Sequence, residues 1–221
     1  MEYNVISTGS HGNAVVLNDY ILIDCGVSFK ALKDVYKDLK IVLLTHAHND
    51  HIKKATIKKL ALERPTLRFA CCEWLIPILV KCNVPEQNID VLEIGKTYDY
   101  KAFKVSPIKL YHDIPNCGYR LFFGDKKVIY ATDTEHLDGI TAKDYDLYLI
   151  EANYTTEDLQ RRIQEKQEKG EYSYEMNAAN RHLSKEQADE FLLENMAAHS
   201  RYEYLHGHIS RETKEDWTYH D

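Results

Sequence analysis

The chain has 221 residues, of which 44% are hydrophobic and 29% charged, and its formal net charge at pH 7 is −7. This balance excludes collagen-like, low-complexity and wholly disordered proteins. The length allows one large core, so we predict a single domain over residues 1–221. No apolar run approaches the roughly 18 residues of a membrane helix, and the N-terminus does not resemble a signal peptide. We therefore predict a cytoplasmic protein without a membrane partner.

The cysteines give no sign of a disulfide framework or a zinc ribbon. They are five in number, and none is followed by a second cysteine at C-x-x-C spacing. Most lie in apolar stretches, which favours free, buried thiols in a reducing compartment. The residues concerned are Cys25, Cys71, Cys72, Cys82 and Cys117.

The first half of the chain alternates short strands with helices. Apolar runs at 14–17 and 20–23 flank a polar pair, which predicts a hairpin. Ser28 is the expected cap of a helix that ends near Leu39. The β-branched run 41–44 predicts a strand buried on both faces. Further helix, strand and helix are expected at 52–64, 68–72 and 73–82.

The second half repeats this pattern. Strands are expected between 91 and 131, with turns at Gly95, Gly118 and Gly124, and again at 147–150. Two helices follow: a solvated one at 156–170, and one at 184–197 that opens with a capping box from Ser184 to Gln187. Strands and helices in this order predict an α/β fold in which helices flank a β-sandwich.

The segment with the strongest chemical signal lies between a buried strand and a helix. It places three imidazoles and one carboxylate within six residues: His46, His48, Asp50 and His51. A strand-to-helix turn can direct His46 and His48 at one metal ion and Asp50 and His51 at another. Borderline metals such as zinc accept this ligation. This spacing after a buried strand is far more specific than a single histidine would be.

At these residues the sequence resembles the metallo-β-lactamase superfamily of metal-dependent hydrolases, whose fold is a four-layer αββα sandwich. The strand 21–26 resembles the family's early strand, in which Asp24 supports a ligand histidine. The resemblance implies two divalent ions, zinc first, with manganese or iron as alternatives. It assigns one ion to His46, His48 and His112, and the other to Asp50, His51 and His208. Asp133 is the implied bridge between them.

Two later segments resemble the tRNA 3′-processing endonuclease (RNase Z) and its relatives. They are 149–153, which contains Glu151, and 180–184, which contains His182. In that branch the glutamate orients the histidine, which donates a proton to the leaving alkoxide. A positioned acid of this kind contributes ~10²–10⁴ in rate. The resemblance therefore implies a phosphodiesterase with Asp50, Glu151 and His182 as its catalytic residues.

Over residues 2–154 and 177–213 the sequence is similar to small bacterial and phage proteins of this branch. They include an exonuclease-like group and cyclic-nucleotide phosphodiesterases. Our main prediction is hydrolysis of a small, cyclic nucleotide, with a metal-bound hydroxide attacking phosphorus and His182 as general acid. As an extension of this prediction, a phage-type enzyme would have an anti-defence role, in which it degrades a cyclic-nucleotide alarm signal of the host. The acidic composition favours this reading over the alternative, a DNA or RNA nuclease with the same site. A non-catalytic binding module is the third hypothesis.

Several features have no settled role at this stage. His11 and His206 could contact substrate phosphate, or could simply be polar residues. Four lysines after the histidine motif could attract an anionic substrate, although a solvated helix face is the simpler interpretation. Relatives are often dimers, so we expect a homodimer in which the segment 154–180 is a lid or dimer arm. The four lysines are Lys53, Lys54, Lys58 and Lys59.

Overall fold

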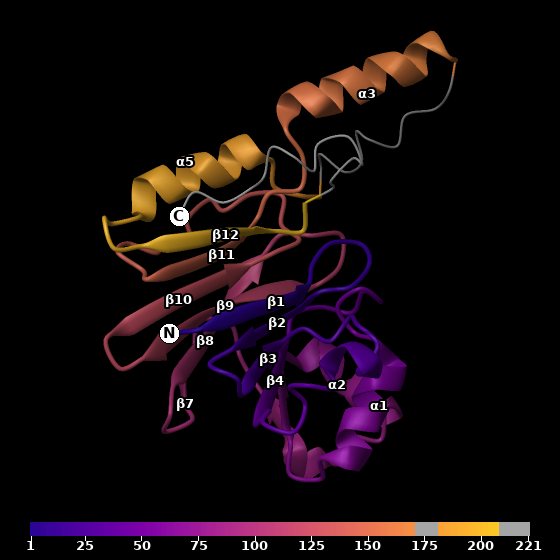
Figure 1. The fold of residues 1–221 in the computed structure, drawn as a ribbon, viewed down its shortest axis with the longest axis vertical. Coiled ribbons are helices and arrows are strands. Elements are labelled where there is room, and N and C mark those ends of the chain that lie inside the picture. Colours follow the sequence, from indigo (N-terminus) through magenta and orange to yellow (C-terminus); the bar gives the residue numbers. More distant parts are fainter. Residues whose placement is uncertain (171–180, 208–221) are drawn as a thin grey trace.

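The computed structural model describes residues 1–170 and 181–207, and its strands form two six-stranded sheets (Figure 1). Each sheet keeps its strands in chain order, from β1 to β6 in the first and from β7 to β12 in the second. The first sheet consists of β1 (Tyr3–Ser7), β2 (Ala14–Leu17), β3 (Ile21–Ile23), β4 (Ile41–Leu44), β5 (Arg68–Cys71) and β6 (Ile89–Val91). The second consists of β7 (Tyr98–Asp99), β8 (Lys104–Leu110), β9 (Asn116–Phe123), β10 (Lys126–Ala131), β11 (Leu147–Glu151) and β12 (Arg201–Leu205).

Helices lie outside both sheets. In Figure 1, α1 and α2 lie beside the first sheet, whereas α5 lies beside β12 and α3 extends away from the rest of the chain. No helix of residues 1–170 and 181–207 is long and apolar enough to cross a membrane. The α-helices are α1 (Lys54–Glu63), α2 (Ile76–Lys81), α3 (Thr156–Glu168) and α5 (Lys185–Asn195). The 3₁₀ turns are η1 (Phe29–Leu32), η2 (Glu73–Leu75) and η3 (Glu86–Asn88).

Three separate apolar clusters show how these layers pack. Alternate side chains of β4 enter different clusters: Val42 and Leu44 pack with the helices α1 and α2, whereas Ile41 and Leu43 pack between the two sheets. A third cluster joins the outer face of the second sheet to α5. The strand is therefore buried on both faces, because successive side chains point in opposite directions. The predicted α/β sandwich with flanking helices is confirmed.

Most of the predicted elements are present within a residue or two. The hairpin joins β2 to β3, and Ser184 and Gln187 form the predicted capping box. All five cysteines are free and buried, as the sequence suggests.

Two local predictions are wrong. The segment 28–39 forms only the short η1 turn and further turns, in which the N–H groups of Ala31, Lys33 and Val35 bond to carbonyls three residues earlier instead of four. Arg64 donates hydrogen bonds to the carbonyls of Tyr36 and Leu39 and so holds the end of this segment from outside it. Gly118 is not a turn residue but lies inside β9. A Cβ at Gly118 would lie 2.4 Å from the Tyr130 carbonyl oxygen, so glycine allows β9 and β10 to approach closely.

The loop that carries the histidine motif is held by backbone hydrogen bonds from the start of the chain. The Asn13 N–H donates to the Asp50 carbonyl at 2.6 Å, and the Cys25 N–H donates to the His51 carbonyl at 2.8 Å. Gly26 lies against the same loop, where a Cβ would come within 1.7 Å of the Asp50 carbonyl oxygen. The motif is thus fixed by its packing as well as by its own sequence.

Candidate metal centre

Three polar residues that follow strands have left-handed backbone conformations. Asp24 comes directly after β3, Asp133 shortly after β10 and His206 directly after β12, with φ values of 58°, 57° and 57°. Residues other than glycine rarely adopt this region, although Asp, Asn and His do so more often than the rest. Such strain gathers at functional sites, where the surrounding structure maintains it. All three side chains are directed into the same polar centre.

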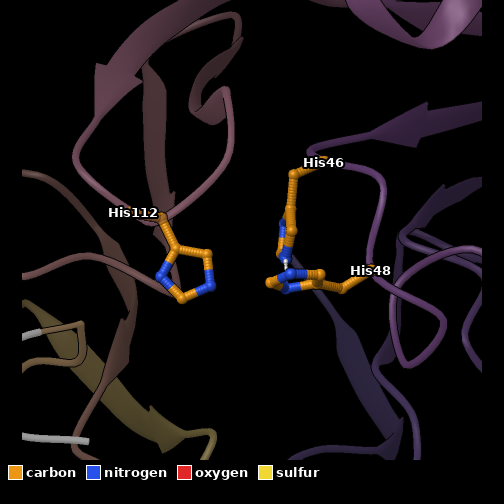
Figure 2. A group of neighbouring side chains, drawn as sticks. All are labelled: His46, His48 and His112. Atoms are coloured by element: carbon orange, nitrogen blue, oxygen red, sulfur yellow. Dashed lines mark hydrogen bonds between the residues drawn. The ribbon is translucent and has the colours of Figure 1, made fainter. Parts of the chain in front are cut away.

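The first group of possible ligands consists of His46, His48 and His112, which face one another across the space between two loops (Figure 2). His46 and His48 follow β4, with their Nε2 and Nδ1 atoms 3.2 Å apart. His112 follows β8 and comes from the opposite side, and its Nδ1 lies 3.0 Å from the Arg181 carbonyl. Burial lowers the pKa of both His46 and His112. Neutral imidazoles with a free nitrogen are what a metal ion requires.

The second group consists of Asp50, His51 and His206. Asp133 lies beside this group and also close to His46, so that one carboxylate adjoins both sets of ligand atoms. Its Oδ2 is 2.8 Å from His51 Nε2, and its Oδ1 is 3.4 Å from His206 Nε2. The arrangement suits two neighbouring cations that share Asp133.

The centre contains buried polar atoms whose hydrogen-bonding capacity is unused. Asp133 Oδ2 and His206 Nε2 have no hydrogen-bond partner among the described residues. The contact of Asp133 Oδ2 with His51 Nε2 at 2.8 Å is a charge contact. Burial would raise the pKa of the Asp133 carboxyl, but the charge of His51 beside it holds that pKa well below its ordinary value. A buried carboxylate that stays ionised next to a buried imidazole nitrogen without a partner fits a metal cation as their common partner.

Asp24 supports this centre from beneath. Its Oδ1 accepts hydrogen bonds from the Thr45 N–H and hydroxyl, both at 3.0 Å, and its Oδ2 lies 2.7 Å from His51 Nδ1. The Tyr130 hydroxyl donates to the same Oδ2 at 3.1 Å. Burial alone would lower the pKa of His51, but Asp24 and Asp133 together raise it to about 10. Asp24 therefore fixes the orientation of His51 and leaves its Nε2 directed at the ligand groups.

Replacing Asp24 by asparagine should weaken metal binding about 10- to 100-fold, the usual cost of removing a carboxylate that orients a ligand histidine. Zinc titration into chelator-stripped protein, followed by calorimetry, measures this change. Asp19→Asn is the matched control, because Asp19 is exposed in the β2–β3 turn and also has a positive φ. Unchanged zinc affinity in a normally folded Asp24→Asn protein would contradict the supporting role of Asp24.

Glu151 and His182 form a pair beside the possible ligands. Glu151 ends β11 and is fully buried, with its Oε1 2.6 Å from His182 Nδ1. Its Oε2 accepts a hydrogen bond from the Thr134 N–H at 2.9 Å, which fixes the carboxylate. Burial would raise the pKa of Glu151, but hydrogen bonds to His182 and His206 lower it. The His182 side chain is 18% exposed, so its ring remains accessible.

The structure gathers six of the seven predicted ligands around one centre, namely His46, His48, Asp50, His51, His112 and Asp133. The seventh, His208, lies outside the described residues. His206 also lies next to Asp50 and His51, with its Nε2 3.5 Å from Asp50 Oδ2. The polar contacts of His206 raise its pKa well above its usual value, against the effect of burial. His11 is exposed, and its role stays a prediction.

Sequence reasoning assigned no role to two residues at this centre. The Asn13 amide nitrogen lies 2.8 Å from His51 Nε2. Asp113 Oδ1 lies 3.2 Å from His112 Nε2 and 3.5 Å from His48 Nε2, while its Oδ2 pairs with Arg181 at 2.9 Å. Their positions in the sequence could have indicated a role, because Asn13 directly precedes β2 and Asp113 directly follows the predicted ligand His112.

Comparison with known families gives a match over most of the chain. Residues 19–201 match the family described as "Beta-lactamase superfamily domain". Among curated proteins, the exodeoxyribonuclease WalJ of Streptococcus pneumoniae is 26% identical, over 96% of this chain and 82% of the relative. The exodeoxyribonuclease YycJ of Bacillus anthracis is 24% identical, over 71% of this chain and 64% of the relative.

Solved structures show the same fold. The metallo-β-lactamase fold protein YhfI of Bacillus subtilis superposes with a TM-score of 0.72 at 18% identity, over 95% of this chain and 88% of that protein. The short form of human tRNase Z superposes with a TM-score of 0.68 at 17% identity, over 94% and 93% of the two chains. These similarities confirm the predicted four-layer architecture. Both curated relatives are named exodeoxyribonucleases, so the comparisons favour the nuclease alternative over our main prediction.

Proposed function

The chain belongs to the β-lactamase superfamily and has the metallo-β-lactamase fold, and from this we propose that it is a metal-dependent nuclease that hydrolyses phosphodiester bonds in nucleic acid. The observation that carries the proposal is the buried Glu151 held against an accessible His182 beside the ligand groups. The relatives named as exodeoxyribonucleases support it. This replaces the small cyclic nucleotide as the preferred substrate.

The proposed role of His182 is to protonate the leaving oxygen. Its Nδ1 faces Glu151 Oε1 at 2.6 Å, so the other ring nitrogen, Nε2, is left to carry the proton to the substrate. The Glu151 carboxylate holds the imidazole ring in place for this transfer. A sugar alkoxide is a poor leaving group and needs this help more than the products of β-lactam or thiolester hydrolysis do.

The proposed ligands are His46, His48 and His112 for one ion and Asp50, His51 and His206 for the other, with Asp133 shared. Zinc is the proposed metal, because imidazole and carboxylate are ligands it accepts, and manganese is the alternative. When bound, two such ions lower the pKa of a water molecule and neutralise charge on the phosphate. Asp24 holds the His51 ring in place, and the close packing of Gly26 against the Asp50 carbonyl fixes the loop that carries these ligands. The homodimer and the cytoplasmic location stay predictions.

A turnover panel with zinc-loaded protein tests this function. We expect cleavage of single- or double-stranded DNA or RNA, loss of cleavage with a chelator, and recovery when zinc is restored. In the same panel, 3′,5′-cyclic purine and pyrimidine nucleotides should remain intact. Cleavage of the cyclic nucleotides alone would reinstate the small-nucleotide phosphodiesterase. Metal-loaded protein that cleaves no phosphodiester at all would instead favour a non-catalytic binding module.

A further inference from the structure

The charges of this chain are unevenly distributed. The segment 28–64 contains nine Lys or Arg residues and four Asp or Glu residues, a net charge of +5. Since the whole chain carries −7, the remaining residues carry −12. Most of this positive charge belongs to seven exposed lysines, which we call the lysine face: Lys30, Lys33, Lys37, Lys53, Lys54, Lys58 and Lys59.

The two parts of the lysine face belong to one surface, because η1 and its following turns pack on α1. The Lys59 ammonium lies 4.4 Å from the centre of the Phe29 ring, and the Thr56 hydroxyl donates to the Val27 carbonyl at 2.7 Å. Positive charge therefore extends from η1 across α1.

The lysine face is not neutralised by neighbouring carboxylates. Within residues 1–170 and 181–207, none of its seven ammonium groups has a carboxylate oxygen within 4.0 Å, although Asp34, Asp38 and Glu63 occur in the same segments. Four lysines elsewhere in the chain each lie within 4.0 Å of an Asp or Glu, namely Lys96, Lys104, Lys126 and Lys185. Unpaired like charges repel one another, and a polyanion would relieve that repulsion.

The lysine face begins at the metal centre. The Cys25 N–H donates a hydrogen bond to the carbonyl of the proposed ligand His51, and the Lys53 N–H donates one to the Cys25 carbonyl, both at 2.8 Å. Helix α1 starts directly after Lys53, at Lys54. Lys54 and Lys58 are four residues apart, or about 6 Å along the helix axis. Successive phosphates of one DNA strand advance about 3.4 Å along the duplex. A strand with one phosphate at the metal centre would thus have further phosphates within reach of α1, whereas a mononucleotide would have none.

We propose that the lysine face binds the phosphate backbone of a nucleic-acid strand whose scissile phosphate lies at the metal centre. This inference rests on the proposed nuclease function and specifies its substrate as a polymer. The contacts are to phosphate, so they add affinity without reading sequence. DNA and RNA share this chemistry, and parallel measurements with each distinguish them.

The test replaces Lys33, Lys54, Lys58 and Lys59 together by glutamine. The matched control replaces four exposed lysines of the opposite sheet and its turns by glutamine: Lys96, Lys101, Lys104 and Lys126. Both variants lose the same charge. Binding of a fluorescent oligonucleotide with a phosphorothioate backbone, which slows hydrolysis, is followed by anisotropy from about 50 to 200 mM salt. We expect the lysine-face variant to bind about tenfold or more weakly at the lowest salt, and its salt slope to decrease by roughly 3.

The control variant should retain the wild-type salt slope, and thermal unfolding should show that both variants fold. Equal slopes for the lysine-face variant and the control would overturn the inference. The inference would also be overturned if the lysine-face variant lost only its binding to anionic lipid vesicles, because the lysine face would then bind a membrane surface. Hydrolysis of bis(p-nitrophenyl) phosphate by the wild type is measured in parallel. If the wild type hydrolyses neither this diester nor any nucleic acid, the proposed function fails, whatever the lysines bind.

Discussion

Replacing Asp133 by asparagine should abolish the activity of this protein, lowering phosphodiester hydrolysis about a thousandfold or more. Among residues 1–170 and 181–207, Asp133 is the one carboxylate that adjoins both ligand groups. Loss of a shared ligand should remove several kcal/mol of charge stabilisation, and each 1.36 kcal/mol corresponds to a factor of ten in rate. Asparagine has nearly the same shape and tolerates the left-handed backbone at this position, where φ is 57°. The change therefore tests the charge rather than the fold.

Metal content measured by mass spectrometry decides the outcome. We expect the Asp133→Asn protein to retain less than the full complement of zinc after dialysis, and to recover little activity when zinc is added back. Asp144→Asn is the matched control, since Asp144 is exposed in a turn and has a φ of 56°. Full metal content together with normal activity in Asp133→Asn would refute the shared-ligand assignment.

Replacing His182 by alanine should leave metal content unchanged but slow cleavage of nucleic acid about 10²–10⁴-fold, the usual contribution of a general acid. The expected effect depends on the leaving group. A sugar alkoxide requires protonation as it departs, whereas p-nitrophenolate departs without it. The rate on bis(p-nitrophenyl) phosphate should therefore change far less than the rate on an oligonucleotide.

The ratio of the two rates separates proton transfer from damage to the site. Equal losses on both substrates, with metal retained, would exclude His182 as the general acid. His199→Ala is the matched control, because His199 is an exposed histidine outside the centre, 3.9 Å from Asp146. Glu151→Gln should reproduce part of the His182 effect, since its proposed role is to orient that ring through the contact with Nδ1.

The ordered elements of this protein were predictable because they depend on short-range patterns. The uninterrupted apolar run at 41–44 predicted a strand buried on both faces, and β4 is such a strand. Prediction failed where distant groups decide the backbone. Arg64 binds the carbonyls of the segment after η1 from 25 to 28 residues away, and the fit of Gly118 depends on the neighbouring strand β10. A local pattern contains no information about either contact.

The position of His206 illustrates the same limit. The sequence left the role of His206 open, whereas in the structure its ring lies beside Asp50 and His51. The pairing of β11 with β12 places Leu205 opposite Glu151, so the next residue, His206, lies beside the Glu151 carboxylate. The Thr8 hydroxyl accepts a hydrogen bond from the His206 N–H at 2.6 Å, across 198 residues of sequence.

By itself, the sequence determined the chemistry available to this protein: imidazoles and carboxylates after a buried strand, and a Glu and a His in the order of a phosphodiesterase. Tertiary structure alone decided which of these groups meet. It placed Asp133 between two ligand sets, put His206 beside Asp50, and gathered lysines of two segments into one face. The physical reason is that residue type and periodicity are properties of the chain. Ligand geometry and surface charge depend on distances between segments, which only strand register and packing set.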